Sequence, residues 1–146
     1  MEQNSKTVNT KNNTNYLKEN SLEEILNNFC YVEKTNEIII NYKYFKILNK
    51  MIDHPSILNY LIIVVDSVLK KYDLFTVHVY IENLTILEIE KNKNFIQNMC
   101  NTLKERFQDK LDLCYIHDVS FIFKQIYSFL SLLIDKKTLS KIKLKQ

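Results

Sequence analysis

The stretch FQDKLDLCYIHDVSFIFKQIYSFLSLLIDKKTLSKIKL, from Phe107 to Leu144, decides the fold class of this chain. It predicts, in order, a strand at 111–116, a turn ending at 118–120, a long helix at 120–134, a lysine turn and a last strand at 141–144. The alternation of strand and helix patterns within one short stretch is typical of a layered α/β domain.

The predicted helix at 120–134 is unusual because almost all of its surface is apolar. Its few polar residues are Lys124, Gln125, Ser128 and Ser131. Helical spacing puts 124, 128 and 131 on one narrow stripe, whereas a surface helix normally has a broad polar side. The helix must therefore bury more than one face. It either packs between the sheet and a neighbouring helix, or forms the wall of an apolar ligand pocket.

Upstream of this stretch, the sequence predicts a polar tail and then further alternation. The tail, residues 1–19, has too little apolar content to order and is predicted to be disordered. The next elements are a helix from Ser21, a hairpin of 29–32 and 38–40, helices at 42–50 and 55–72, a strand at 75–81 and a helix ending at Phe107. Residues 20–146 therefore form one α/β domain, with a mixed, mostly parallel sheet and helices on both faces.

Two positions in these upstream elements carry specific expectations. Asn36, in the turn of the hairpin, is the residue best able to adopt a left-handed backbone conformation. The strand at 75–81 alternates apolar residues with Thr76, His78 and Tyr80. Parallel sheets are usually covered on both faces, so these three side chains are expected to be covered and to need hydrogen-bond partners.

The composition excludes several classes of protein. With 20 basic and 17 acidic residues the net charge is +3, which is too small to indicate nucleic-acid binding. No apolar run approaches the roughly 20 residues of a membrane span, and the polar N-terminus predicts a cytoplasmic protein. The widely spaced Cys30, Cys100 and Cys114 are predicted to be reduced thiols.

Catalytic and metal-binding motifs are also missing. The chain contains no Gly, so it has no phosphate-binding loop, dinucleotide fingerprint or nucleophile elbow. It has no HExxH motif and no readable Cys–His pair. We therefore predict that it is not an enzyme and that it needs no metal or other cofactor.

The opening stretch resembles the C-terminal signature of the CRAL-TRIO (Sec14-like) lipid-binding domain. Residues 107–110 stand for the first turn of that signature, 114–118 for the strand and its end, and 134–138 with 140–142 for the closing motif. The prolines usual in the family are replaced by Gln108, Ser120, Leu132 and Lys136. Farther upstream, Asn83 stands where the family has a Gly.

This resemblance implies that the chain binds or transfers a phospholipid or a similar small lipophilic ligand, in a pocket gated by the 120–134 helix. The shortage of polar positions on that helix predicts an apolar lining: Phe123, Ile126, Tyr127, Leu130 and Ile134. The family's contacts to an inositol phosphate fall on Asp109 and Lys141 here. The expected partners are then the lipid and, transiently, a membrane surface.

His117, just after the strand, is also similar to the branch of the family that includes BCH domains. That resemblance implies an interaction module with a collapsed pocket, which binds small GTPases or their regulators. A third reading, a basic surface for membranes or nucleic acid, rests on the C-terminal lysines: Lys136, Lys137, Lys141, Lys143 and Lys145. Such a lysine run is usually a solvated face, and we predict no nucleic-acid partner.

Overall fold

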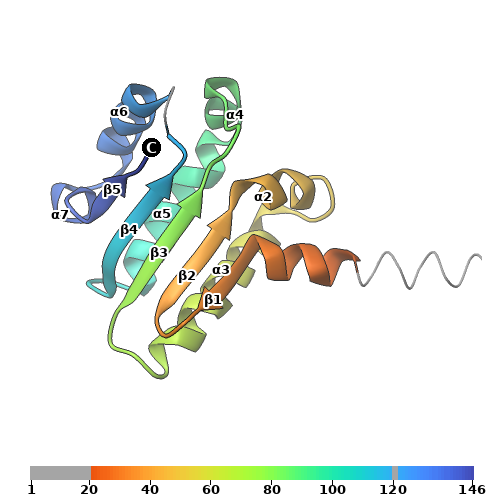
Figure 1. Ribbon diagram of the computed structural model, residues 1–146, viewed down its shortest axis with the longest axis vertical. Coiled ribbons are helices and arrows are strands. Elements are labelled where there is room, and N and C mark those ends of the chain that lie inside the picture. The colour runs from red at the N-terminus through yellow and green to blue at the C-terminus, as the bar shows by residue number, and fades with distance from the viewer. Residues whose placement is uncertain (1–20, 120–121) are drawn as a thin grey trace, which may run out of the picture.

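The computed structural model describes residues 21–119 and 122–146 (Figure 1). The tail predicted at 1–19 and the first two residues of the predicted 120–134 helix lie outside the described residues. Residues 21–29 are helical. The elements that follow are β1 (Cys30–Glu33), β2 (Glu37–Asn41), α2 (Tyr42–Leu48), α3 (His54–Leu69), β3 (Phe75–Tyr80), α4 (Ile86–Lys91), α5 (Lys93–Arg106), β4 (Leu111–His117), α6 (Phe123–Leu133), α7 (Lys136–Leu139) and β5 (Ile142–Leu144).

The strands form one five-stranded sheet in the order β1-β2-β3-β4-β5. The hairpin β1–β2 is antiparallel, and the pairs β2–β3, β3–β4 and β4–β5 are parallel. The prediction of a single α/β domain with a mixed, mostly parallel sheet is therefore confirmed. The last strand begins at Ile142 rather than at the predicted Lys141.

The order of the strands also explains the placement of the helices. Connections between parallel strands are right-handed almost without exception. When each new strand is added on the same side of the sheet, every such connection returns its helices to the same face. In Figure 1, α3 and α5 lie behind the sheet, and no described helix crosses in front of it. The expected second helical layer is therefore absent from the part of the chain that the structure describes.

The covered face carries two hydrophobic cores. The larger one joins the helix 21–29, α2, α3 and α5 to the strands, around fully buried residues such as Leu48 and Ile57. The smaller one joins α4 and α6 to the upper halves of β3 and β4, around Ile89, Ile116 and Ile126. The apolar α6 thus packs on the smaller core, at the end of the sheet where the parallel strands finish.

Local chemistry fixes the ends of several elements. The side chain of Asp53 accepts a hydrogen bond from Ser56 N at 2.9 Å and caps α3, whose first turn contains Pro55. Asn83 has a φ of 62°, so it adopts the left-handed conformation of the Gly that it replaces.

The prediction for the hairpin turn was wrong by two residues. Lys34, with a φ of 60°, makes the left-handed step instead of Asn36. The carbonyl of Asn36 accepts from Thr76 N at 3.0 Å, so this residue already takes part in the pairing with β3. Its side-chain amide donates to Leu74 O at 3.0 Å and ties the turn to the next loop.

Candidate functional site

A partly open cavity of about 250 Å³ lies between the smaller core and the adjoining part of the larger one. Its floor is the sheet, with Val79, Cys114 and Ile116 pointing up from β3 and β4. Its walls and roof come from α4, α5 and α6, including Ile89, Met99 and Ile126. The cavity lies toward the carboxyl ends of the parallel strands, where open α/β sheets usually hold their ligands.

The two cysteines in the cavity wall act as apolar surface. Burial raises the pKa of the Cys100 thiol to about 11 and that of the Cys114 thiol to about 12. Both thiols therefore stay protonated at neutral pH and are poor nucleophiles. Among the described residues all three cysteines are free, in agreement with the prediction of reduced thiols.

One end of the cavity is bordered by a polar group centred on Glu88. Its carboxylate accepts from Lys46 Nζ at 2.8 Å and from Thr85 N at 2.9 Å. Burial alone would raise the pKa of Glu88, but Lys46, Thr85 and Tyr42 together hold it below its ordinary value. Burial and the nearby Glu88 raise the pKa of the Tyr42 hydroxyl. The carboxylate is thus already satisfied by protein groups, and the lining next to it remains mainly apolar.

The predicted pocket residues on α6 divide into three groups. Ile126, Leu130 and Ile134 line the cavity, as their spacing of four residues along one helical face requires. Tyr127 is 52% exposed and lies outside this cavity, because it is one position around the helix from Ile126. The side chain of Phe123 lies outside the described part of the chain.

Several residues of this site were not predicted from the sequence. Phe129 of α6 lines the cavity as well. The polar group also escaped notice, because Tyr42 and Glu88 are 46 positions apart in the sequence and no local motif connects them. The one local signal was the capping box from Thr85 to Glu88, which marks the start of α4.

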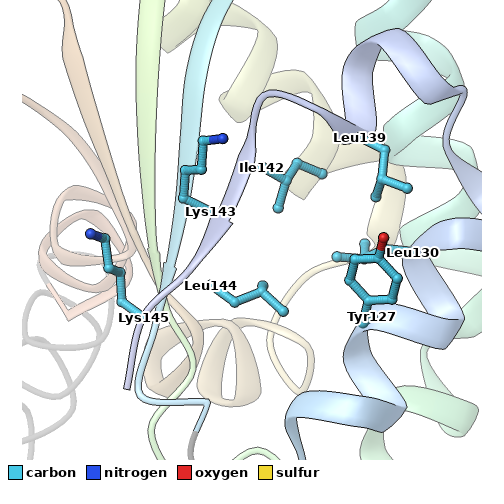
Figure 2. Close-up of a pocket in the computed structure, with 7 residues that line it drawn as sticks. All are labelled: Tyr127, Leu130, Leu139, Ile142, Lys143, Leu144 and Lys145. Carbon is cyan, nitrogen blue, oxygen red and sulfur yellow. The ribbon is translucent and has the colours of Figure 1, made fainter.

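Tyr127 lines a second space, a groove of about 340 Å³ between α6, α7 and β5 (Figure 2). Ile142 and Leu144 point from β5 toward Tyr127 and Leu130, whereas Lys143 and Lys145 point to the other side of the strand. Leu130 and Ile142 line both the groove and the cavity. These two side chains therefore form part of the wall that separates the two spaces.

Comparison with known proteins identifies the family of this chain. The family model described as CRAL/TRIO domain matches residues 22–146. The chain belongs to the CRAL/TRIO domain family. The crystal structure of Sfh5 has the same fold: it is 14% identical, covers 82% of this chain and aligns with a TM-score of 0.69. This chain spans 48% of that structure, about half of its length. No curated protein sequence matches the chain.

Family membership supports the first reading of the sequence, since CRAL/TRIO domains bind lipophilic small molecules. It does not specify the ligand of this domain. No described helix is long and apolar enough to cross a membrane. Within residues 21–119 and 122–146, no group of three or more His, Cys, Asp or Glu side chains is placed to hold a metal ion.

In this CRAL/TRIO domain the two predicted head-group residues lie at the amino-terminal ends of β4 and β5. Asp109 accepts from Lys137 Nζ at 2.7 Å, and Lys137 holds the pKa of Asp109 below its ordinary value. Lys141 donates from Nζ to Leu111 O at 2.7 Å. Both side chains are therefore engaged with protein groups, and neither lines the cavity.

The face of the sheet without helices carries a row of polar side chains, and the sequence pointed only to those on β3. His78 Nε2 lies 3.2 Å from Glu37 Oε1, and His78 Nδ1 lies 3.0 Å from His117 Nε2. Tyr80 stacks on His117 with ring centroids 4.4 Å apart. His78 has the partners that were expected, but they come from neighbouring strands rather than from a second helical layer.

Proposed function

We propose that this domain binds a lipophilic small molecule in the cavity between the sheet and α4, α5 and α6. The observation that carries the proposal is the cavity itself: about 250 Å³ of space bordered mainly by apolar side chains. Close-packed protein cores rarely contain voids much larger than a water molecule. A cavity of this size, in a family that binds lipophilic molecules, is best explained by a ligand.

The volume limits what fits in this conformation. An apolar cavity of about 150 Å³ is enough to bind benzene, and pockets for drug-sized ligands start at roughly 300 Å³. At about 250 Å³ the cavity holds a ring system or a short chain. A phospholipid acyl chain would also need the adjacent groove of about 340 Å³. We therefore propose that binding of a larger ligand requires α6 to move.

The position of α6 suits it to act as the gate. Its Leu130 is in the wall between cavity and groove, and Ile142 of β5 is the facing part of that wall. An outward shift of α6 would separate these two side chains and join the two spaces. The apolar outer surface of the helix, with Leu132 86% exposed, could then rest on the acyl region of a membrane during loading.

A pair of matched substitutions on α6 tests the site. Ile126→Phe adds volume inside the cavity, whereas Leu132→Phe adds a similar volume on the exposed surface. The test measures binding of a fluorescent fatty acid and the lipids that remain bound to the purified protein in native mass spectrometry. We expect Ile126→Phe to lose both signals and Leu132→Phe to keep them. Retention of both signals in a folded Ile126→Phe protein would refute this cavity as the site.

We also propose that the head group of the ligand contacts Asp109 and Lys141, as the family resemblance implies. Lys141 would offer its remaining donors to a phosphate, and Asp109 would accept from inositol hydroxyls after release from Lys137. The support is position, since both residues match the family signature. Nearby Lys136 and Lys143 add general attraction to anionic membrane surfaces, worth about 1 kcal/mol for each lysine.

Substitution separates the specific contact from the general attraction. Lys141→Ala should abolish binding of phosphoinositide-containing vesicles, while Lys143→Ala, which removes the same charge nearby, should leave most of it. Equal and small losses for both variants, which disappear at high salt, would leave only a basic surface.

The interaction-module alternative predicted a collapsed pocket. The described residues instead enclose about 250 Å³ of space, so no observation favours this alternative over ligand binding.

A further inference from the structure

The helix-free face of the sheet carries side chains from all five strands in a regular arrangement. The register pairs Glu33 with Glu37 on β1 and β2. It pairs His78 with Tyr115 and Tyr80 with His117 on β3 and β4, and Tyr115 in turn with Lys143 on β5. None of these side chains belongs to either hydrophobic core. They form a second surface with its own chemistry.

Charge is separated across this surface. The acidic side, on β1 and β2, carries Glu33 and Glu37. The basic side carries Lys143 and Lys145, which border the groove but project from β5 and its end on the side opposite Ile142 and Leu144 (Figure 2). Lys145 Nζ lies 5.4 Å from the centre of the Tyr115 ring, which confirms that it is on this face.

Aromatic rings occupy the middle of the surface. They come from the two central strands: His78, Tyr80, Tyr115 and His117. Their ring planes lie within 8° to 19° of one another for the pairs Tyr80–His117, His78–His117 and His78–Tyr115, so they form an ordered block. An aromatic centre between charged margins is the arrangement typical of a protein interface.

We propose that this face binds a second copy of the same chain, in a symmetric dimer packed sheet against sheet. Parallel sheets are normally covered on both faces, and here the described helices cover only one. The acidic and basic sides of this face are complementary to each other, which favours a second copy of the same chain as the partner. A two-fold axis parallel to the strands places β1 and β2 of one copy over β5 of the other, so Glu33 and Glu37 face Lys143 of the partner copy and the aromatic blocks meet.

The same charges exclude the other symmetric arrangement. A two-fold axis in the interface but perpendicular to the strands would place β1 over β1 and β5 over β5. The acidic side of the face would then lie over the acidic side of the other copy, and the basic side over the basic side. Like charges placed opposite each other across an interface are unfavourable. The proposed dimer therefore has its strands roughly aligned, as in other packed sheets, in which the mean directions differ by about 30°.

The size of the surface predicts a weak dimer. Five strands spaced about 4.8 Å apart, with a mean length of five residues at about 3.3 Å each, give a face of about 24 by 17 Å, or about 400 Å². This is about half of the roughly 800 Å² that each partner buries in a standard stable complex. The dimer should therefore dissociate on dilution and weaken with added salt, because its charged margins are accessible to solvent.

Charge exchange between two variants tests the arrangement. One variant carries Glu33→Lys and Glu37→Lys, and the other carries Lys143→Glu and Lys145→Glu. Lys136→Glu, on α7 and exposed, is the control for a charge reversal outside this face. Circular dichroism checks the fold, and sedimentation equilibrium across a concentration series measures assembly of each protein and of an equimolar mixture.

We expect the wild-type chain and the Lys136→Glu control to dimerise, and each charge variant alone to be monomeric. The mixture should recover the dimer, because each altered margin then faces an opposite charge on the other variant. A wild-type monomer at every concentration would overturn the proposal, whatever else covers this face. Dimerisation of the single charge variants, or a mixture that stays monomeric, would also overturn it.

Discussion

Glu37, His78 and His117 are linked by contacts of hydrogen-bond length across three strands. The carboxylate of Glu37 accepts from Nε2 of His78 at 3.2 Å. Nδ1 of His78 lies 3.0 Å from Nε2 of His117, and this contact needs one donor and one acceptor. Protonation of both rings would remove the acceptor and place two positive charges 3.0 Å apart.

This arrangement predicts that stability falls in mild acid. Burial and the nearby His78 and Lys145 lower the pKa of His117, although Asp118 opposes them. The unfolded chain therefore binds a proton at a higher pH than the folded one. The contribution of His117 is fully present above about pH 6.5 and is lost as the pH falls through the folded pKa.

Urea unfolding of wild type and His117→Gln at about pH 7.5 and about pH 5.5 measures this effect, above the range where most carboxylates titrate. We expect wild type to lose more unfolding free energy between the two conditions than His117→Gln. An equal loss in both proteins would show that His117 does not contribute.

At the scale of elements, α6 shows how one helix can serve both a core and a cavity. Ile126 and Leu130 are buried in the smaller core, with 5% and 9% of their surfaces exposed. On the opposite side, Leu132 is 86% exposed. The sequence analysis concluded that more than one face must be buried. In the structure one face packs on the core, a second borders the groove and a third is left to solvent.

Two truncations on α6 separate these roles. Leu130→Ala removes a buried side chain from the wall of the cavity, and we expect it to cost about 2–5 kcal/mol of unfolding free energy. Leu132→Ala should change stability by less than about 0.5 kcal/mol. Chemical denaturation measures both. If Leu130 is also part of the gate, stopped-flow release of a bound fluorescent lipid should be faster in the Leu130→Ala protein. A similar small effect of both variants would contradict the packing of α6.

The start of α4 supplies a further prediction. Thr85 caps the helix by accepting from Glu88 N at 3.2 Å, and Glu88 returns a bond to Thr85 N at 2.9 Å. Thr85→Ala should therefore cost about 0.5–2 kcal/mol of unfolding free energy. The Glu88 carboxylate should keep its bonds to the Thr85 backbone N–H and to Lys46, because this substitution removes neither donor. Thr85→Ser, which keeps the capping oxygen, should restore most of the stability in the same denaturation experiment.

Local patterns in the sequence were enough to predict most of these elements. The apolar periodicity of α3 and α5, the alternation in β3 and the residues Asp53 and Pro55 placed the helices and strands within a few positions. The left-handed position of the hairpin turn was wrongly assigned to Asn36, because only the backbone propensities of the turn residues were used to choose it. The pairing of its carbonyl with Thr76, a tertiary contact, had the larger effect.

At the scale of the whole molecule, the cavity depends on elements far apart in the sequence. Its lining runs from Phe29 to Ile142 and includes strands as well as five of the labelled helices, α2 to α6, with α3 contributing Leu61. The sequence indicated one wall, α6, since its apolar excess was visible locally. It gave no indication of Glu88 or of the space left between side chains, because a void depends on how distant elements pack.

A ligand in this cavity should stabilise the whole domain, since the unfolded chain has no cavity to bind it. At a free ligand concentration of 100 times Kd the gain is about 2.7 kcal/mol. For a domain of this size it should raise Tm by on the order of 10 °C. Differential scanning fluorimetry with a medium-chain fatty acid measures the shift. Ile126→Phe should show little shift, because the added ring occupies the same space, while Leu132→Phe should respond as wild type does. Equal shifts in all three proteins would place the ligand elsewhere on the molecule.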